Sequence, residues 1–138
     1  MRKSFLRAAL AATLCAAARV AMAGPNDAAI DEIITAAAAD WSTLLSCSVL
    51  DGTEHETLLR WWNEERTSVS SLLGQAGVAP TDAEGFMARL EPAVLLAPTG
   101  GDLATLTAFC DEAGDWRRRA ATFTVVQPSK EIRDLLGR

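Results

Sequence analysis

Apolar residues recur at intervals of three and four positions through most of this chain, which is the spacing that places them on one face of an α-helix. Stripes of this kind occupy residues 30–45, 58–73, 86–95 and 103–113. Polar and charged residues separate the apolar positions within each stripe, as in a helix with one buried face. The sequence therefore predicts an all-α fold, a small bundle of four to five helices in a single domain.

Capping and turn residues mark where these helices are expected to begin and end. Asn26 or Asp27 is predicted to cap the first helix, and Gly52 is predicted to end it in a left-handed conformation. The sequences at 53–56 and 81–84 have the Thr-x-x-Glu pattern of a capping box, which predicts the starts of the second and third helices.

The third helix contains a proline, Pro92, so we expect a kink or a restart near Glu91. A proline in a helix removes one backbone hydrogen bond and clashes with the preceding turn. Residues 98–101 predict a turn, and a fourth helix is expected from about Asp102. Gly114 is expected to break that helix before the next tryptophan.

The last part of the chain permits two interpretations. Residues 122–126 are rich in β-branched side chains and alternate weakly, as strand residues do. No second segment of this kind exists to pair with it, so we expect either an extended arm or a frayed helix end that lies on the bundle. Ser129 is predicted to cap a short final helix.

The first 23 residues resemble a secretory signal peptide. Residues 1–3 are basic at positions 2 and 3, residues 5–18 are mostly apolar and rich in alanine, and residues 21–23 have the small-x-small pattern of a signal-peptidase site. We expect cleavage after Ala23, which would leave residues 24–138 as one helical domain. The expected location is therefore periplasmic or secreted.

A retained membrane anchor is the alternative for this leader, and its length argues against it. The apolar stretch has about 14 residues and is interrupted by Arg7, whereas a spanning helix needs roughly 20. Lipidation at Cys15 is also disfavoured, because the preceding Leu14 is large where a small residue is required. We expect no stable association with a membrane.

Export would make the protein strongly acidic. The whole chain has a net charge of −5, but four of its 13 basic residues lie in the leader and all 18 acidic residues follow it. The exported chain would therefore carry a net charge of −9. Such a surface repels phosphate backbones and anionic lipids, so nucleic acid is not an expected partner.

Two cysteines, Cys47 and Cys110, remain after the leader is removed. An even pair in an oxidising compartment predicts a disulfide, which would stabilise the fold by roughly 4 kcal/mol in the chain-entropy model. A redox-active pair would more typically have C-x-x-C spacing, which is absent here. In an up-down-up-down bundle the end of the first helix and the early turns of the fourth lie at the same end, where the two cysteines are placed.

Candidate catalytic and metal-binding residues are few. His55 is the single histidine, so a serine or cysteine nucleophile would need it as a base. It is expected to be exposed in the first turn of a helix, and its acidic neighbours Asp51, Glu54 and Glu56 point in different directions. A haem ligand pair of His55 and Met87 would require residues at opposite ends of the bundle. We therefore predict no enzymatic activity, no metal site and no cofactor.

The candidate interaction surface consists of aromatic and basic residues. Trp61 and Trp62 are about 100° apart on a helix, so one of them is expected at the edge of the buried stripe. Trp61 either contributes to binding, as tryptophan and arginine often do, or packs on the carboxy-terminal segment. The cluster at 117–119 either docks an acidic partner or favours the negative end of the fourth helix. The candidate residues are Arg60, Trp61, Arg66, Arg117, Arg118 and Arg119.

These observations favour a small exported protein that is not an enzyme and acts by contact with another, unidentified protein. Such a protein would be an inhibitor, a chaperone-like protein or an accessory factor. In outline the layout is similar to small helical periplasmic acid-stress chaperones, which also carry one disulfide. The alternative is a carrier of small apolar ligands, with a pocket between the helices opened by the kink at Pro92.

Overall fold

The computed structural model describes residues 24–96 and 102–138, and every regular element within these two ranges is a helix. The fold is a small all-α bundle with an interrupted third helix and one disulfide, as predicted. The leader (1–23) and the whole of the predicted turn at 98–101 lie outside the described residues. The helices are α1 (Asp27–Ser48), α2 (Gly52–Gln75), α3 (Pro80–Arg89), α4 (Pro92–Leu96), α5 (Leu103–Ala113), α6 (Trp116–Thr122) and α7 (Pro128–Leu135).

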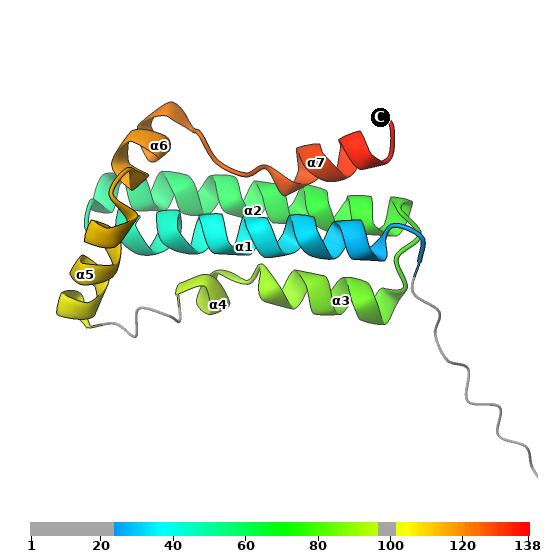
Figure 1. Cartoon of the computed structure of the whole chain (residues 1–138), viewed down its shortest axis with the longest axis horizontal. Coiled ribbons are helices and arrows are strands. Elements are labelled where there is room, and N and C mark those ends of the chain that lie inside the picture. The colour runs from blue at the N-terminus through cyan, green and yellow to red at the C-terminus, as the bar shows by residue number, and fades with distance from the viewer. Residues whose placement is uncertain (1–23, 97–101) are drawn as a thin grey trace, which may run out of the picture.

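Two long antiparallel helices, α1 and α2, lie side by side at the centre of the molecule (Figure 1). Their stripes of apolar residues face each other, and Trp41 and Trp62 meet with ring centroids 4.6 Å apart. Both tryptophans are completely buried. Burial of two such large side chains at one contact makes this hairpin the centre of the hydrophobic core.

The remaining helices cover this hairpin from different sides (Figure 1). α3 and α4 lie along one side, while α6 and α7 follow the opposite side. None of the helices that the structure describes combines the length and the apolar character that crossing a bilayer requires.

The placement of α5 corrects the predicted bundle. This helix does not run antiparallel to the others but lies across the end of the hairpin where α1 stops and α2 begins (Figure 1). It has 11 residues and buries only Leu106 and Cys110, and it stops at Gly114, whose φ is +55°. The predicted break at Gly114 is therefore confirmed, and it leaves α5 too short to span the bundle. Cys110 consequently lies near the end of α5 and not in its early turns.

The interruption at Pro92 is confirmed. α3 ends at Arg89 and α4 restarts at Pro92, so the two helices form separate pieces along the same side of α1. The buried indole N–H of Trp62 donates to the carbonyl oxygen of Leu90 at 2.9 Å. On the α1 side, the hydroxyl of Ser42 donates to the carbonyl oxygen of Leu95 at 2.6 Å. Side chains of the central hairpin thus hold both halves of the broken helix.

Three predicted helix starts, those of α2, α3 and α7, are each wrong by two residues. α2 begins at Gly52 with Asp51 at its N-cap position, so Thr53 lies inside the helix and not at the predicted N-cap position. Gly52 does not end α1, because α1 stops at Ser48 and the turn before α2 is only three residues long. Gly52 also lacks a positive φ.

Prolines explain why α3 and α7 begin earlier than predicted. α3 begins at Pro80 and α7 at Pro128, so the predicted caps at Thr81 and Ser129 lie inside these helices. Proline suits the first helical position because its φ is already helical and it has no N–H to leave unpaired. Asn26 occupies the N-cap position of α1 as predicted, although its side chain makes no capping hydrogen bond.

The carboxy-terminal part contains the extended arm. α6 ends at Thr122, residues 124–127 are not helical, and α7 follows. Phe123, at the junction, has a left-handed backbone with a φ of +50°. The arm lies on the central hairpin, because both backbone polar groups of Val126 bond to side chains of α1.

Candidate interaction surface

Three of the six predicted surface residues are engaged in ion pairs within the fold, and two of these pairs join separate parts of the chain. Arg66 of α2 pairs with Glu91, which lies between α3 and α4. Arg119 of α6 pairs with Asp40 of α1, and its Nε–H also donates to the carbonyl oxygen of Thr124 at 3.2 Å. Both arginines therefore join separate parts of the chain, and neither presents a free guanidinium to a partner.

Trp61 packs within the molecule. Its ring meets the ring of Phe123 nearly edge-on, with centroids 4.5 Å apart. It is half-buried, whereas the neighbouring Trp62 is fully buried. Packing of Trp61 on the carboxy-terminal segment was one of its two predicted interpretations, and the structure confirms that contact.

Arg117 and Arg118 are exposed at the start of α6. Arg117 lies over the ring of Trp116 at 4.5 Å, and Arg118 pairs with Asp115 at 3.4 Å. The interpretation that they favour the negative end of the fourth helix is wrong, because Gly114 ends α5 before them. They occupy the first turn of a new helix, where the backbone dipole is positive.

Arg60 belongs to a face of α2 that no other described helix covers. The face runs along the helix, and the residues that define it, here called the α2 face, are Glu56, Leu59, Arg60, Asn63, Glu64, Thr67, Ser70 and Ser71. Two adjoining depressions of about 460 and 510 Å³ follow it, and both include Asn63 and Thr67. Met87 of α3 borders the second depression.

The sequence contains a pattern that indicates the α2 face, although a search for particular residue types did not detect it. Positions 56, 60, 63, 67 and 71 are polar and repeat at three- and four-residue spacing, opposite to the apolar stripe of the same helix. A search for aromatic and basic residues selected Arg60 alone from this face. Of the six predicted residues, only Arg60 and the ion-paired Arg66 line these two depressions.

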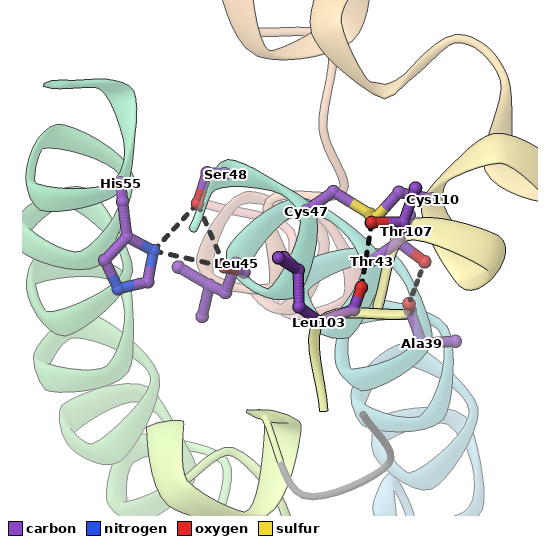
Figure 2. Close-up of a disulfide and its surroundings, with 9 residues drawn as sticks. All are labelled: Ala39, Thr43, Leu45, Cys47, Ser48, His55, Leu103, Thr107 and Cys110. Carbon is purple, nitrogen blue, oxygen red and sulfur yellow. Dashed lines mark hydrogen bonds between the residues drawn. A yellow bond between two sulfur atoms is a disulfide. The ribbon is translucent and has the colours of Figure 1, made fainter. Parts of the chain in front are cut away.

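The predicted disulfide is present between Cys47 and Cys110, with their Cα atoms 5.5 Å apart (Figure 2). It joins the last turn of α1 to α5, and both cysteines are at most 3% exposed. The disulfide is therefore a structural link inside the fold, which fixes α5 across the end of the hairpin.

His55 is half-buried, which corrects the prediction that it is exposed. Its Nδ1 lies 2.9 Å from the hydroxyl of Ser48 and 3.1 Å from the carbonyl oxygen of Leu45 (Figure 2). The Ser48 hydroxyl donates to the same carbonyl oxygen at 2.9 Å, and Ser48 is completely buried. This cluster fastens the first turn of α2 to the last turn of α1 and leaves the Ser48 oxygen out of reach of a substrate.

Within residues 24–96 and 102–138, no three His, Cys, Asp or Glu side chains are grouped so that they could hold a metal ion. The comparisons with known proteins add no relative: no protein family, no curated protein and no solved structure matches this chain.

Proposed function

We propose that this chain is an exported protein that is not an enzyme and acts by binding another protein through the α2 face. The observation that carries the proposal is the uncovered stripe on α2. The other sides of this helix contact α1, α3 and α7, whereas this stripe is left open over several turns. It combines the half-buried Leu59, the bordering Met87, alternating charges and small hydroxyl side chains.

The composition of the α2 face suits a reversible contact. Arg60 is flanked one turn away on either side by Glu56 and Glu64, so a partner would need charges of both signs in a matching order. Alternating charge of this kind contributes specificity and association rate more than affinity. Apolar contact area from Leu59 and Met87 would supply the affinity.

Export is supported by two independent features. Disulfides form and persist in oxidising compartments, and the Cys47–Cys110 bond is buried in the fold. The sequence of residues 1–23 has the three regions of a secretory signal. We therefore propose a periplasmic or secreted protein.

The carrier of small apolar ligands is the less favoured alternative. A pocket opened by the break at Pro92 would lie where Leu90 faces the hairpin, yet Leu90 is fully buried and bonded to Trp62. Three depressions of about 460, 470 and 510 Å³ lie on the surface, and most of their lining residues are polar.

The proposal is tested by capture of a partner from the envelope or secreted fraction of the native host. The protein is purified from that host, and its complexes are measured by native mass spectrometry. We expect a protein partner that Arg60→Glu weakens at least about tenfold, and that the matched charge reversal Arg117→Glu on α6 leaves bound. Equal binding of both variants would place the contact elsewhere, and a co-purified small molecule without a protein partner would favour the carrier.

A further inference from the structure

Side chains of α1 and α2 bind backbone groups of the carboxy-terminal segment of the same chain, as side chains of a peptide-binding protein bind a peptide. This segment, residues 123–138, comprises the arm and α7 and lies along the α1–α2 hairpin (Figure 1). Asp40 accepts a hydrogen bond from the backbone N–H of Val126 at 2.8 Å. The indole N–H of Trp41 donates to the carbonyl oxygen of the same residue, also at 2.8 Å. Two consecutive residues of α1 thus bind both polar groups of one extended residue, and neither contact depends on the side chain of Val126.

The start of α7 is recognised in a similar way. One carboxylate oxygen of Glu65 accepts from the backbone N–H of Ser129 at 3.2 Å, and the other accepts from its hydroxyl at 2.7 Å. The first N–H groups of a helix lack partners within the helix, so a carboxylate there satisfies a free donor and meets the positive end of the dipole. Glu65 belongs to α2, so the helix start is capped from outside the segment.

Apolar anchors complete the contact at both ends of the segment. Phe123 lies edge-on to Trp61 at 4.5 Å and to Trp41 at 6.4 Å. Ile132 of α7 is completely buried, while Leu135 on the same helix is 39% exposed. One aromatic anchor, one non-helical residue held by its backbone, one capped helix start and one aliphatic anchor follow each other along the segment.

The carboxy-terminal segment contains no cysteine, so the disulfide does not tie it to the rest of the fold. The covalent loop closes at Cys110, so the whole segment lies outside it. α7 has eight residues, and an isolated helix of that length is not stable in water. Phe123 has a left-handed backbone immediately before the arm, where a change of one residue's dihedral angles would redirect the rest.

We propose that the groove formed by Asp40, Trp41, Trp61 and Glu65 is a peptide-binding site that the carboxy-terminal segment occupies in cis. Its partner is a segment of another protein that presents an extended apolar residue and then a short amphipathic helix with an aliphatic residue in its second turn. A segment with an acidic residue at the position of Ser129 is not expected as the partner, because the carboxylate of Glu65 lies there. This site goes beyond the α2 face and shares with the proposed function only the premise of polypeptide binding.

The first test measures hydrogen exchange of the wild-type chain with its disulfide intact. We expect amides of Val126 and α7 to exchange at least about tenfold faster than the buried amides of α1 and α2, because the segment opens while the body stays folded. Exchange of both parts at one common rate would overturn the proposal. This test needs no substitution, so misfolding of a variant cannot obscure it.

The second test uses a labelled synthetic peptide of residues 122–138 as the probe. A vacated groove binds a competing peptide more tightly in proportion to the fraction of open molecules. We therefore expect the apparent Kd for the Ile132→Ala protein to be at least about tenfold lower than for wild type. Leu135→Ala, on the exposed side of the same helix, should leave it unchanged. A peptide that carries Ile132→Asp, or that is methylated at the Val126 nitrogen, should not bind. Equal binding of all peptides, or none to either protein, would overturn the proposal.

The two proposals fail separately. If the Arg60→Glu protein loses the captured partner but still binds the 122–138 peptide normally, both proposed binding surfaces would be supported. If the 122–138 peptide does not displace a captured partner, and both parts of the chain exchange at a common rate, the proposal for the α2 face would stand. The proposal for the groove would then be contradicted. A wild-type dimer that the peptide dissociates would identify a second copy as the occupant and overturn the assignment to a separate partner.

Discussion

Trp62 and Leu90 are joined by a hydrogen bond from the buried indole N–H to a backbone carbonyl oxygen, at 2.9 Å. The carbonyl belongs to the residue that follows α3, two positions before Pro92. In a continuous helix the N–H of Val94 would bond to Leu90, but it bonds to Glu91 instead, so the carbonyl oxygen of Leu90 depends on the indole. A side chain of α2 thus satisfies a polar group that the break in the third helix leaves free.

Trp62→Phe should therefore lower the free energy of unfolding by about 1–3 kcal/mol, because the buried carbonyl oxygen of Leu90 loses its donor. The measurement is urea denaturation followed by circular dichroism. Trp61→Phe is the matched control on the adjacent, half-buried position and should cost less than about 1 kcal/mol. Equal costs at both positions would show that ring size and not the hydrogen bond matters at Trp62.

Loss of the disulfide should destabilise the fold strongly. Cys47 and Cys110 are separated by 63 positions, and a link over that distance restricts the unfolded chain by roughly 4 kcal/mol in the chain-entropy model. The double variant Cys47→Ala/Cys110→Ala should lose about this much in urea denaturation. Wild-type protein measured in the presence of a reductant provides the control, and an unchanged midpoint in both would contradict the entropic role.

Asp40 should contribute more to the free energy of unfolding than an exposed carboxylate in a similar ion pair. Its side chain is 12% exposed and bonds to both Arg119 and the N–H of Val126. Asp40→Ala leaves these donors unpaired and should cost about 1–3 kcal/mol. Asp115→Ala removes the exposed pair with Arg118 and should cost less than about 1 kcal/mol. Similar urea midpoints for the two variants would contradict a structural role for the Asp40 contacts.

The sequence predicted the features that depend on spacing and on a single residue type. Apolar periodicity indicated the long helices, Pro92 indicated the break in the third, and the even cysteine pair indicated the disulfide. The helices and the break follow from local chemistry, and the disulfide follows from the oxidising compartment that export implies. Packing of Trp61 on the carboxy-terminal segment was also anticipated, because adjacent helical positions cannot both face the core.

The orientation of α5 and the groove beneath the carboxy-terminal segment could not be predicted in this way. The groove depends on contacts between residues far apart in the chain, such as Asp40 with Val126 and Glu65 with Ser129, and the orientation of α5 depends on its packing against α1. Neither pair has a motif that a single sequence displays. The helix starts were missed for a different reason, since a proline or glycine at the first helical position competed with a good capping pattern one residue later.

Gly52 offers a direct test of one corrected start. A glycine that ended α1 would need a positive φ, and replacement by alanine would be unfavourable. In the structure Gly52 opens α2, has no positive φ, and has no heavy atom within 4 Å of an added Cβ. Gly52→Ala should therefore stabilise the fold by about 0.5 kcal/mol, since alanine restricts the unfolded chain.

Gly114→Ala is the control for this substitution. Its added Cβ would also have open space, but its φ is +55°, so alanine there should cost about 1–3 kcal/mol. Thermal denaturation should show a higher Tm for Gly52→Ala and a lower Tm for Gly114→Ala than for the wild-type protein. Destabilisation by Gly52→Ala would contradict the start of α2 at that residue.

Asp102 should stabilise α5 in a manner that depends on pH. It is the N-cap of α5, and its carboxylate accepts from the hydroxyl and N–H of Thr105 and from the N–H of Ala104. These hydrogen bonds, with the Thr105 hydroxyl as the largest contribution, hold the pKa of Asp102 below its ordinary value of 3.8. A pKa that is lower in the folded chain favours folding above the unfolded value, and that benefit is lost as the pH falls through the folded value.

Asp102→Ala should accordingly lower the Tm by a few degrees at pH 7, and its difference from wild type should shrink as the pH falls below about 4. Asp102→Asn caps without titrating and should follow wild type at pH 7. The measurement is the Tm by circular dichroism between pH 7 and pH 2.5, with the disulfide intact. A difference between Asp102→Ala and wild type that stays constant over this range would show that the charge of Asp102 does not contribute, because the loss of a neutral cap would not change with pH.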